Sequence, residues 1–242
     1  ERYEVVVKAI LGPDEKDDKS VRVLNRIVTW TADDSIELEP DQRHVDIIIR
    51  DSGIDSERAK PVTTPGVKDK FDNEYDLKLL DGRSTTLYRS LTMRCQYLAQ
   101  DRSDLQFASK ELARGMQSPT QGHWAKVKRV ARYLKMRPRV AIEFRKQDFG
   151  SFVDVWVDTD HAGCVRTRRS TNGGALCFGS HTLKSWSTTQ AVVALSSGEA
   201  EYYGIVKGAS VLLGALRLFR DLGVSDRKGR ELKGRLHTDS SA

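Results

Sequence analysis

The sequence predicts an α+β protein in which a mixed sheet flanked by helices follows a helical region and a small α+β module. Three observations support this prediction. β-prone runs surround one helix after Phe152, helical periodicity dominates 87–136, and short alternating runs precede a helix within 1–60. The 242 residues, 38% of them hydrophobic and 31% charged, are typical of a globular protein with a buried core.

The first module, residues 1–60, is predicted to contain a small sheet followed by a helix. Its strands are expected in three runs of partly alternating side chains, at 3–11, 21–30 and 35–39. A charged loop with Gly and Pro, at 12–19, would join the first two strands. Pro40–Asp41 then indicates the start of a helix that stops near Gly53.

A linker is predicted at 61–86, because this segment holds two prolines, several charges and no sustained period. A helical connection at 87–138 follows it. We expect three helices there, the third with Ser118 as its N-cap and Pro119 in its first helical position.

The third of these helices carries the clearest charge pattern in the chain. Between His123 and Arg139 there are seven basic residues and no acidic one. Lys128, Arg132 and Lys135 are expected on one face, opposite an apolar stripe. Such a face is either simply solvated or a track for the phosphates of a nucleic acid.

The C-terminal part begins with an alternating run, 152–158, that predicts a strand. Two β-prone runs, 174–180 and 182–188, are joined tightly at Gly179–His181, and a further short strand is expected at 234–238. We expect the first three strands to be antiparallel and the last to pair in parallel with the first.

Three of these elements place an acidic residue near one edge of the sheet. Asp158 ends the first strand, Glu201 lies in the first turn of a helix begun by Ser196–Ser197, and Asp239 follows the last strand. Carboxylates from a strand, a helix and a second strand are the layout of a two-metal phosphodiester nuclease, and lone carboxylates suit Mg²⁺. The sequence therefore predicts a metal site with Asp158 and Asp239 side by side.

Two neighbouring acids compete for these positions. Glu199 and Glu201 are two residues apart, so on a helix they point about 200° away from each other and only one can face the strand ends. Asp158 and Asp160 line the same edge of a strand. The residue pattern alone leaves both choices open.

Five motifs follow one another in this part of the chain: Val157–Gly163 (VDTDHAG), Arg168–Gly174 (RRSTNGG), Ser185–Ser187 (SWS), Val193–Tyr202 (VALSSGEAEY) and Thr238–Ala242 (TDSSA). In this order and at similar spacing they resemble the ribonuclease H domain of copia-type LTR retrotransposon Pol polyproteins. Segments 97–99, 104–108 and 123–135 are similar to the helical connection of that family, so the resemblance covers most of the chain. One departure is His161, where the family usually has Trp.

The resemblance implies a ribonuclease H-like domain at 139–242 behind the C-terminal tail of a reverse transcriptase region at 1–60. The family's fourth acidic ligand, last strand and last helix would lie beyond Ala242, so the domain is expected to be incomplete at its C-terminus. Nothing in the sequence resembles the paired aspartates of the polymerase palm, and no reverse transcriptase active site is expected.

The function implied by the resemblance is hydrolysis of the RNA strand of RNA–DNA hybrids by a two-metal mechanism during reverse transcription. Asp158, Glu201 and Asp239 would be the catalytic metal ligands, and Mg²⁺ or Mn²⁺ the cofactor. The expected partners are the hybrid and the remainder of the Pol polyprotein, with its polymerase palm and integrase. The alternative is a catalytically inactive or truncated nucleic-acid-binding fragment of such a polyprotein.

Seven residues are predicted to contact the nucleic acid: Lys128, Arg132, Lys135, Arg168, Arg169, Ser197 and Ser240. The arginines after the first strand could equally solvate their loop, and the two serines could equally be cap and loop residues. His161 and Cys164 lack the second ligand pair that a soft metal needs, and His237 is expected to be packed.

Composition narrows the remaining possibilities. A net charge of +6 is compatible with a polyanionic partner. The three cysteines lack CxxC spacing and are expected to be free thiols in a reducing compartment. The sequence has no membrane-spanning apolar run, signal peptide or Walker, G-x-G-x-x-G or G-x-S-x-G motif. The expected location is the cytoplasm, within a virus-like particle, with the nucleus as a further site, and no membrane partner is expected.

Overall fold

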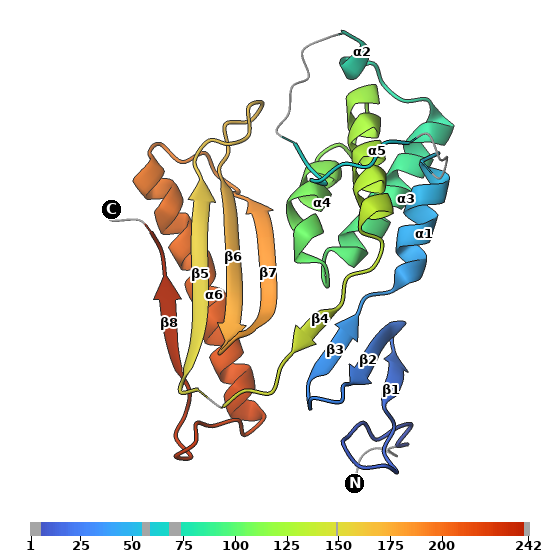
Figure 1. Cartoon of the computed structure of the whole chain (residues 1–242). Helices are drawn as coiled ribbons and strands as arrows, with labels where there is room; N and C mark the ends of the chain where they lie inside the picture. Colours follow the sequence, from blue (N-terminus) through green and yellow to red (C-terminus); the bar gives the residue numbers. More distant parts are fainter. Residues whose placement is uncertain (1–5, 55–58, 68–73, 149, 240–242) are drawn as a thin grey trace.

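The computed structural model describes residues 6–54, 59–67, 74–148 and 150–239, and the structural statements below concern these residues (Figure 1). Within them the chain has an α+β architecture with two four-stranded sheets and six α-helices. One sheet and a bundle of helices form one side of the molecule, and the second sheet with its long helix forms the other (Figure 1). No helix in the described part of the chain is long and apolar enough to span a membrane.

The first sheet is an antiparallel meander in the order β1-β2-β3-β4. Its strands are β1 (Ser20–Val23), β2 (Arg26–Trp30), β3 (Ile36–Glu39) and β4 (Ile142–Phe144). The fourth strand comes from a segment about a hundred residues further along the chain. It pairs with β3 through the antiparallel ladder, and Arg139, just before β4, forms an ion pair with Glu39 at 2.8 Å.

Two strand predictions in this region were wrong. The run 21–30 is two strands, because Leu24 and Asn25 have φ of +50° and +64° and form a two-residue hairpin turn between Val23 and Arg26. Such turns need positive φ at both positions, which Asn tolerates well. The run predicted as a strand at 3–11 has no strand at its described residues 6–11, where only an isolated bridge at Leu11 occurs, and residues 3–5 lie outside the described part.

Helices α1, α3, α4 and α5 enclose one apolar core. Their bounds are α1 (Gln42–Asp51), α3 (Gly82–Leu98), α4 (Gln106–Ala113) and α5 (Gln121–Met136), with the short α2 (Glu74–Leu77) and a 3₁₀ turn (Ser103–Leu105) beside them. Fully buried side chains include Ile48, Leu91 and Leu134. Since Val45 and Ile48 of α1 belong to this core, the predicted first module and the helical connection share a hydrophobic centre.

Two helix starts differ from the prediction. Helix α5 begins after Thr120, not Ser118, because the Thr120 hydroxyl and the His123 side chain cap each other's backbone N–H. The chain just before it is extended: Pro119 accepts a hydrogen bond from Leu80 N at 3.0 Å. Helix α3 begins at Gly82, inside the predicted linker, because the Asp81 carboxylate accepts from Ser84 N at 2.9 Å.

The second sheet has the order β7-β6-β5-β8. Its strands are β5 (Phe152–Asp160), β6 (Thr171–Phe178), β7 (His181–Thr189) and β8 (Lys233–His237). β5, β6 and β7 are antiparallel neighbours, and β8 pairs with β5 in parallel. The strand order and directions predicted from the sequence are therefore confirmed.

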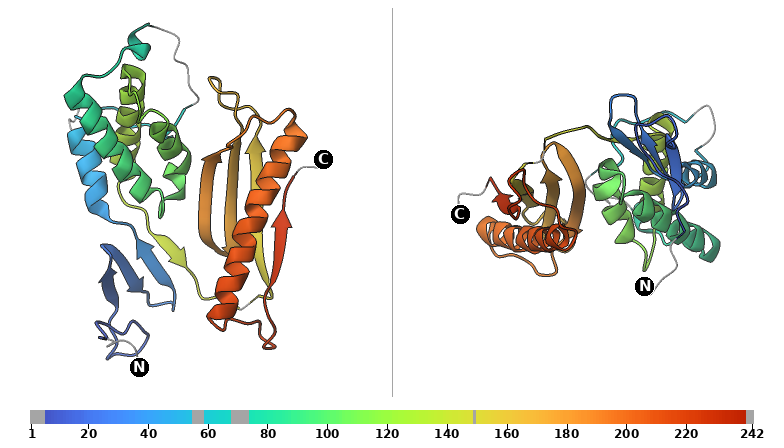
Figure 2. Two further views of the ribbon diagram at one scale, coloured as in Figure 1. Left: turned by 180° about the vertical axis from the view of Figure 1, so that it is seen from behind. Right: turned by 90° about the horizontal axis from the view of Figure 1, so that it is seen from below.

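Helix α6 (Ser197–Asp221) crosses one face of this sheet (Figure 2). Val153, Val155 and Val157 point from β5 into the core beneath it and are at most 6% exposed. Burying each such side chain contributes roughly 1.5–3 kcal/mol. At the β7 edge of this sheet, α4 packs against β7. This contact joins the helical bundle to the second sheet.

Candidate metal centre

Asp158, Glu201 and Asp239 lie together at one end of the second sheet. One carboxylate oxygen from each residue can be chosen so that all three atoms lie within 4.8 Å of one another. The fold explains this proximity. Trp156 of β5 pairs with His237 of β8 in parallel, so Asp158 and Asp239, each two residues further along, lie on the same side. Asp158 is not the last residue of its strand as predicted, because β5 continues to Asp160 through its pairing with Thr171 of β6. Helix α6 brings Glu201 to them from its first turns.

The pKa of Glu201 responds to the proximity of the three carboxylates. Burial and the nearby charges of Asp239 and Asp158 raise the pKa of Glu201, and hydrogen bonds from Thr159 oppose the rise. Its Oε2 is buried and has no hydrogen-bond donor in the described part of the chain. A buried carboxylate oxygen without a donor, next to two further carboxylates, is a position where a cation would be stabilising.

The donor set suits a hard divalent cation. All three candidate ligands offer carboxylate oxygens, which Mg²⁺ and Mn²⁺ prefer, and Asp158 and Asp239 are exposed enough to leave positions for water or substrate. Glu201 Oε2, which has no hydrogen-bond donor among the described residues, would gain a partner in such a cation. The residues present therefore fit a divalent metal.

A buried polar network lies beneath the carboxylates. Gln190 Nε2 donates to Asn172 Oδ1 at 2.6 Å and to the Ala200 carbonyl at 2.8 Å, and Thr159 Oγ1 donates to Asn172 Oδ1 at 3.4 Å. These bonds join β5, β6 and the first turn of α6. They fix the position of the helix start, and therefore of Glu201, relative to the strand that carries Asp158.

The competing acids have other contacts. Glu199 accepts hydrogen bonds from Leu195 N at 2.7 Å and from the Tyr203 hydroxyl at 3.2 Å, so it stabilises the start of α6. Asp160 lies near Gly163 and lines a small cavity beside α4. The structure brings Glu201 and Asp158, and neither of these two acids, into the carboxylate cluster.

Comparison with known proteins places the chain among retroelements. It is 36% identical over 167 residues to the retrovirus-related Pol polyprotein from transposon RE2 of Arabidopsis thaliana, a match that covers 69% of this chain and 11% of that polyprotein. The polyprotein from transposon RE1 of the same plant is 35% identical over 167 residues, with the same two shares. Pol polyproteins of this copia type recur among the relatives. The chain is a homologue of copia-type retrotransposon Pol polyproteins.

A further relative of this Pol homologue is much shorter. The secreted RxLR effector protein 161 of Plasmopara viticola is 36% identical over 104 residues, which are 43% of this chain and 72% of that protein. No protein-family model matches the chain. The chain spans about a ninth of the length of the two polyproteins above, as the 11% shares state.

The Pol homologue has a second feature beside the carboxylates that the sequence did not predict. On the face of the sheet that α6 leaves uncovered, Trp156 and His237 stack with ring centroids 3.9 Å apart. Asp154 binds Arg235 Nε and His237 Nε2, both at 2.7 Å. Asp158, Asp239 and this aromatic pair line a shared open groove of about 510 Å³. The alternating pattern of each strand shows which side chains share a face. Only the parallel register of β5 and β8 shows that Trp156 and His237 are neighbours on that face.

The predicted nucleic-acid contacts are dispersed over the Pol homologue. Lys128 is exposed on α5, but Arg132 Nε donates to the Lys60 carbonyl at 2.6 Å and so holds the segment before the helix. Lys135 is half-buried and has a partner. Helix α5 lies on the far side of α4 from the second sheet (Figure 1). The structure therefore does not bring this helix face to the carboxylates.

The other predicted contacts lie nearer the carboxylates. Arg168 and Arg169 are exposed in the loop that follows β5. Ser197 is exposed at the start of α6, and the capping hydroxyl is that of Ser196, which accepts from Glu199 N at 3.1 Å. Ser240 lies outside the described residues.

Proposed function

We propose that this chain is the ribonuclease H part of a copia-type Pol polyprotein and hydrolyses the RNA strand of RNA–DNA hybrids with Mg²⁺ or Mn²⁺. The observation that supports this function is the cluster of Asp158, Glu201 and Asp239, delivered by a strand, a helix and a parallel strand. The ribonuclease H-like fold is part of the same proposal. The matched polyproteins supply the biological setting.

The three carboxylates would hold the metal, and the buried network beneath them would keep their geometry. A bound divalent ion supplies Lewis-acid polarisation of the phosphodiester and lowers the pKa of an attacking water. Asp158 accepts a hydrogen bond from Thr159 N at 2.8 Å, which fixes one of its oxygens. Asp239 lies beside it and Glu201 faces both, so the cluster presents a concentrated negative charge at the edge of the open groove.

Substrate would be held by the exposed cations around this edge. Arg168 and Arg169 extend from the loop after β5 and can contact phosphates that cross the carboxylates. Ser197, at the exposed start of α6, would donate a hydrogen bond to a 2′-hydroxyl or a phosphate. Lys128, exposed on α5, would contact phosphates further from the carboxylates. The partner in this proposal is an RNA–DNA hybrid, and the rest of the Pol polyprotein would provide the polymerase.

The test is cleavage of an RNA strand labelled at its end and annealed to DNA, in the presence of Mg²⁺ and of Mn²⁺. We expect cleavage by the chain and its loss in Asp158→Asn, with Asp160→Asn as the matched control that retains activity. Salt-sensitive binding of the hybrid without cleavage by either metal would instead support the catalytically inactive fragment. Equal loss in both variants would contradict the assignment of Asp158.

A further inference from the structure

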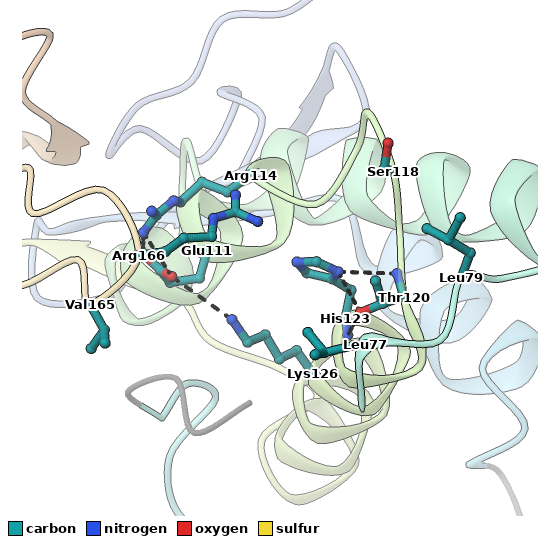
Figure 3. Close-up of a pocket in the computed structure, with 10 residues that line it drawn as sticks. All are labelled: Leu77, Leu79, Glu111, Arg114, Ser118, Thr120, His123, Lys126, Val165 and Arg166. Atoms are coloured by element: carbon teal, nitrogen blue, oxygen red, sulfur yellow. Dashed lines mark hydrogen bonds and ion pairs between the residues drawn. The ribbon is translucent and has the colours of Figure 1, made fainter. Parts of the chain in front are cut away.

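A second cavity lies at the junction of the helical bundle and the second sheet. It has a volume of about 430 Å³ and is lined by α4, the start of α5, the chain at 77–79 and the loop after β5 (Figure 3). This volume falls within the range of roughly 300–1,000 Å³ that is usual for sites that bind small molecules. None of the carboxylates of the metal centre lines it.

The lining of this junction pocket includes three cations. Arg114, Lys126 and Arg166 line it together with a single acid, Glu111 (Figure 3). Glu111 is 8% exposed, and its Oε1 lies 2.8 Å from Lys110 Nζ and 3.3 Å from Arg114 Nη1. Lys126 Nζ is 3.9 Å from its Oε2.

Glu111 is therefore shared among three cations, Lys110, Arg114 and Lys126. Burial disfavours its charge, but the hydrogen bond from Lys110 and the charges of Arg114 and Lys126 outweigh burial and lower the pKa of Glu111. Arg166 is exposed and, within the described residues, pairs with no acid. Among the described lining residues, three cations therefore accompany one acid, and Arg166 is the cation that Glu111 does not contact.

Apolar side chains also line the pocket, and two of them are held in place by the backbone. Leu77 and Leu79 line the pocket and are 61% and 63% exposed, and Val165 faces them from the loop after β5. The chain that carries the leucines pairs with the start of α5: Gln121 N donates to the Lys78 carbonyl at 2.9 Å. Exposed aliphatic side chains fixed around a cavity are typical of a binding site.

We propose that the junction pocket binds one nucleotide of a single-stranded nucleic acid. The phosphate would lie against Arg114, Lys126 and Arg166, and the unpaired base against Leu77, Leu79 and Val165. A cation pair or triad binds phosphate oxygens by charge-assisted hydrogen bonds, and an apolar wall accepts the face of a base. A duplex does not fit, because its bases are stacked and paired and cannot enter a cavity.

The position of the pocket favours a nucleic-acid strand over an isolated small anion. Lys126 belongs both to the pocket and to the basic series of α5, which extends away from it without an acid between His123 and Arg139. Arg166 belongs to the loop that also carries Arg168 and Arg169. A strand seated in the pocket would therefore meet further exposed cations along the loop after β5.

The test uses fluorescence anisotropy with a fluorescein-labelled single-stranded DNA of about 12 nucleotides, without divalent metal. DNA alone is no substrate of the proposed nuclease, so the result does not depend on that function. Arg166→Glu should weaken binding about tenfold and lower the slope of log affinity against log salt by about one. Arg22→Glu, an equal charge change at an exposed position of β1, is the matched control.

The apolar wall is tested with Leu79→Ser and, as a second variant, Val165→Ser. Both side chains are exposed, so folding should be preserved, and circular dichroism checks this. We expect weaker binding of the intact strand and unchanged binding of a strand of the same length with abasic sites. Equal effects of Arg166→Glu and Arg22→Glu would overturn the phosphate contact, and equal effects of the serine variants on intact and abasic strands would overturn the base contact.

Discussion

Gly208 of α6 packs so closely against Val157 of β5 that a Cβ atom on the glycine would lie 2.5 Å from the valine Cγ1. The same atom would lie 3.2 Å from Cγ1 of Val155. The missing side chain at this position therefore lets the helix lie directly on the strand that carries Asp158. Because Glu201 stands two turns earlier on the same helix, this contact sets the distance between the two carboxylates.

Gly208→Ala should consequently destabilise the protein and disturb the metal centre. Overpacking of a well-filled core typically costs about 1–3 kcal/mol, which exceeds the gain of about 1 kcal/mol in helix propensity. Urea unfolding gives the change in the free energy of unfolding. Cleavage of the labelled hybrid by the folded variant would fall as well, since the helix must shift away from β5.

Gly214→Ala is the control on the same helix. A Cβ there meets nothing within 4 Å, so only the gain in helix propensity remains and the variant should be slightly more stable than the wild type. A Gly208→Ala protein as stable as Gly214→Ala would show that the close contact with β5 does not constrain the helix.

Arg102 should be among the most sensitive positions of the helical bundle. Its side chain is 1% exposed and binds Asp104 at 2.7 Å and the carbonyls of Arg137 and Pro138 at 2.9 and 3.2 Å. Removing one member of a buried ion pair leaves unpaired groups and costs about 3–5 kcal/mol. We expect a loss of that size for Arg102→Ala in urea unfolding, and a loss within about 1 kcal/mol for Arg139→Ala, whose pair with Glu39 is exposed.

The sequence was sufficient for the elements whose periodicity and caps are local. Alternation along 152–158 and the Asp41 and Ser196 caps were visible in it, and the parallel partner of β5 was expected from the motif order. Two other features had only a weak local signal. The turn at Leu24–Asn25 has no glycine to mark it, and the early start of α3 depends on the single Asp81 cap.

In the candidate site, too, some features were predictable from the sequence and others were not. Asp158, Glu201 and Asp239 were selected by motif, and the structure brings them together. The junction pocket was not foreseeable, because its walls come from residues between 77 and 166 that meet only when the bundle packs on the sheet. Arg132 was assigned to nucleic acid by helical periodicity alone, which cannot show that its guanidinium binds the Lys60 carbonyl.

Cys164 should titrate at a lower pH than Cys95. Burial disfavours its thiolate, but hydrogen bonds from Thr167 and Arg114 outweigh burial and lower the pKa of Cys164 to about 7. Burial alone raises the pKa of Cys95 to about 12. Alkylation followed by mass spectrometry should show Cys164 labelling that rises through neutral pH, with Cys95 unmodified in the folded protein. In Thr167→Val the rise should move to higher pH, and an unchanged profile would contradict the role of Thr167.

Glu201 links the stability of the protein to both pH and metal. Its pKa is raised above the ordinary value of 4.5, so the protonated form is favoured in the folded state. The stability that this provides is complete below pH 4.5 and is lost as the pH rises through the raised pKa. Without metal, thermal unfolding should therefore show Glu201→Gln to be more stable than the wild type at neutral pH, with the difference shrinking as the medium becomes acidic.

Mg²⁺ should reverse this order at neutral pH. A cation bound to the three carboxylates would add about 2.7 kcal/mol to the wild type when free Mg²⁺ is about 100 times its dissociation constant. Glu201→Gln has one ligand charge fewer and should gain much less, and Glu199→Gln, which alters the neighbouring acid outside the cluster, should gain as much as the wild type. Equal gains in all three proteins would mean that Mg²⁺ stabilises the fold from elsewhere, because only the cluster distinguishes the two glutamates.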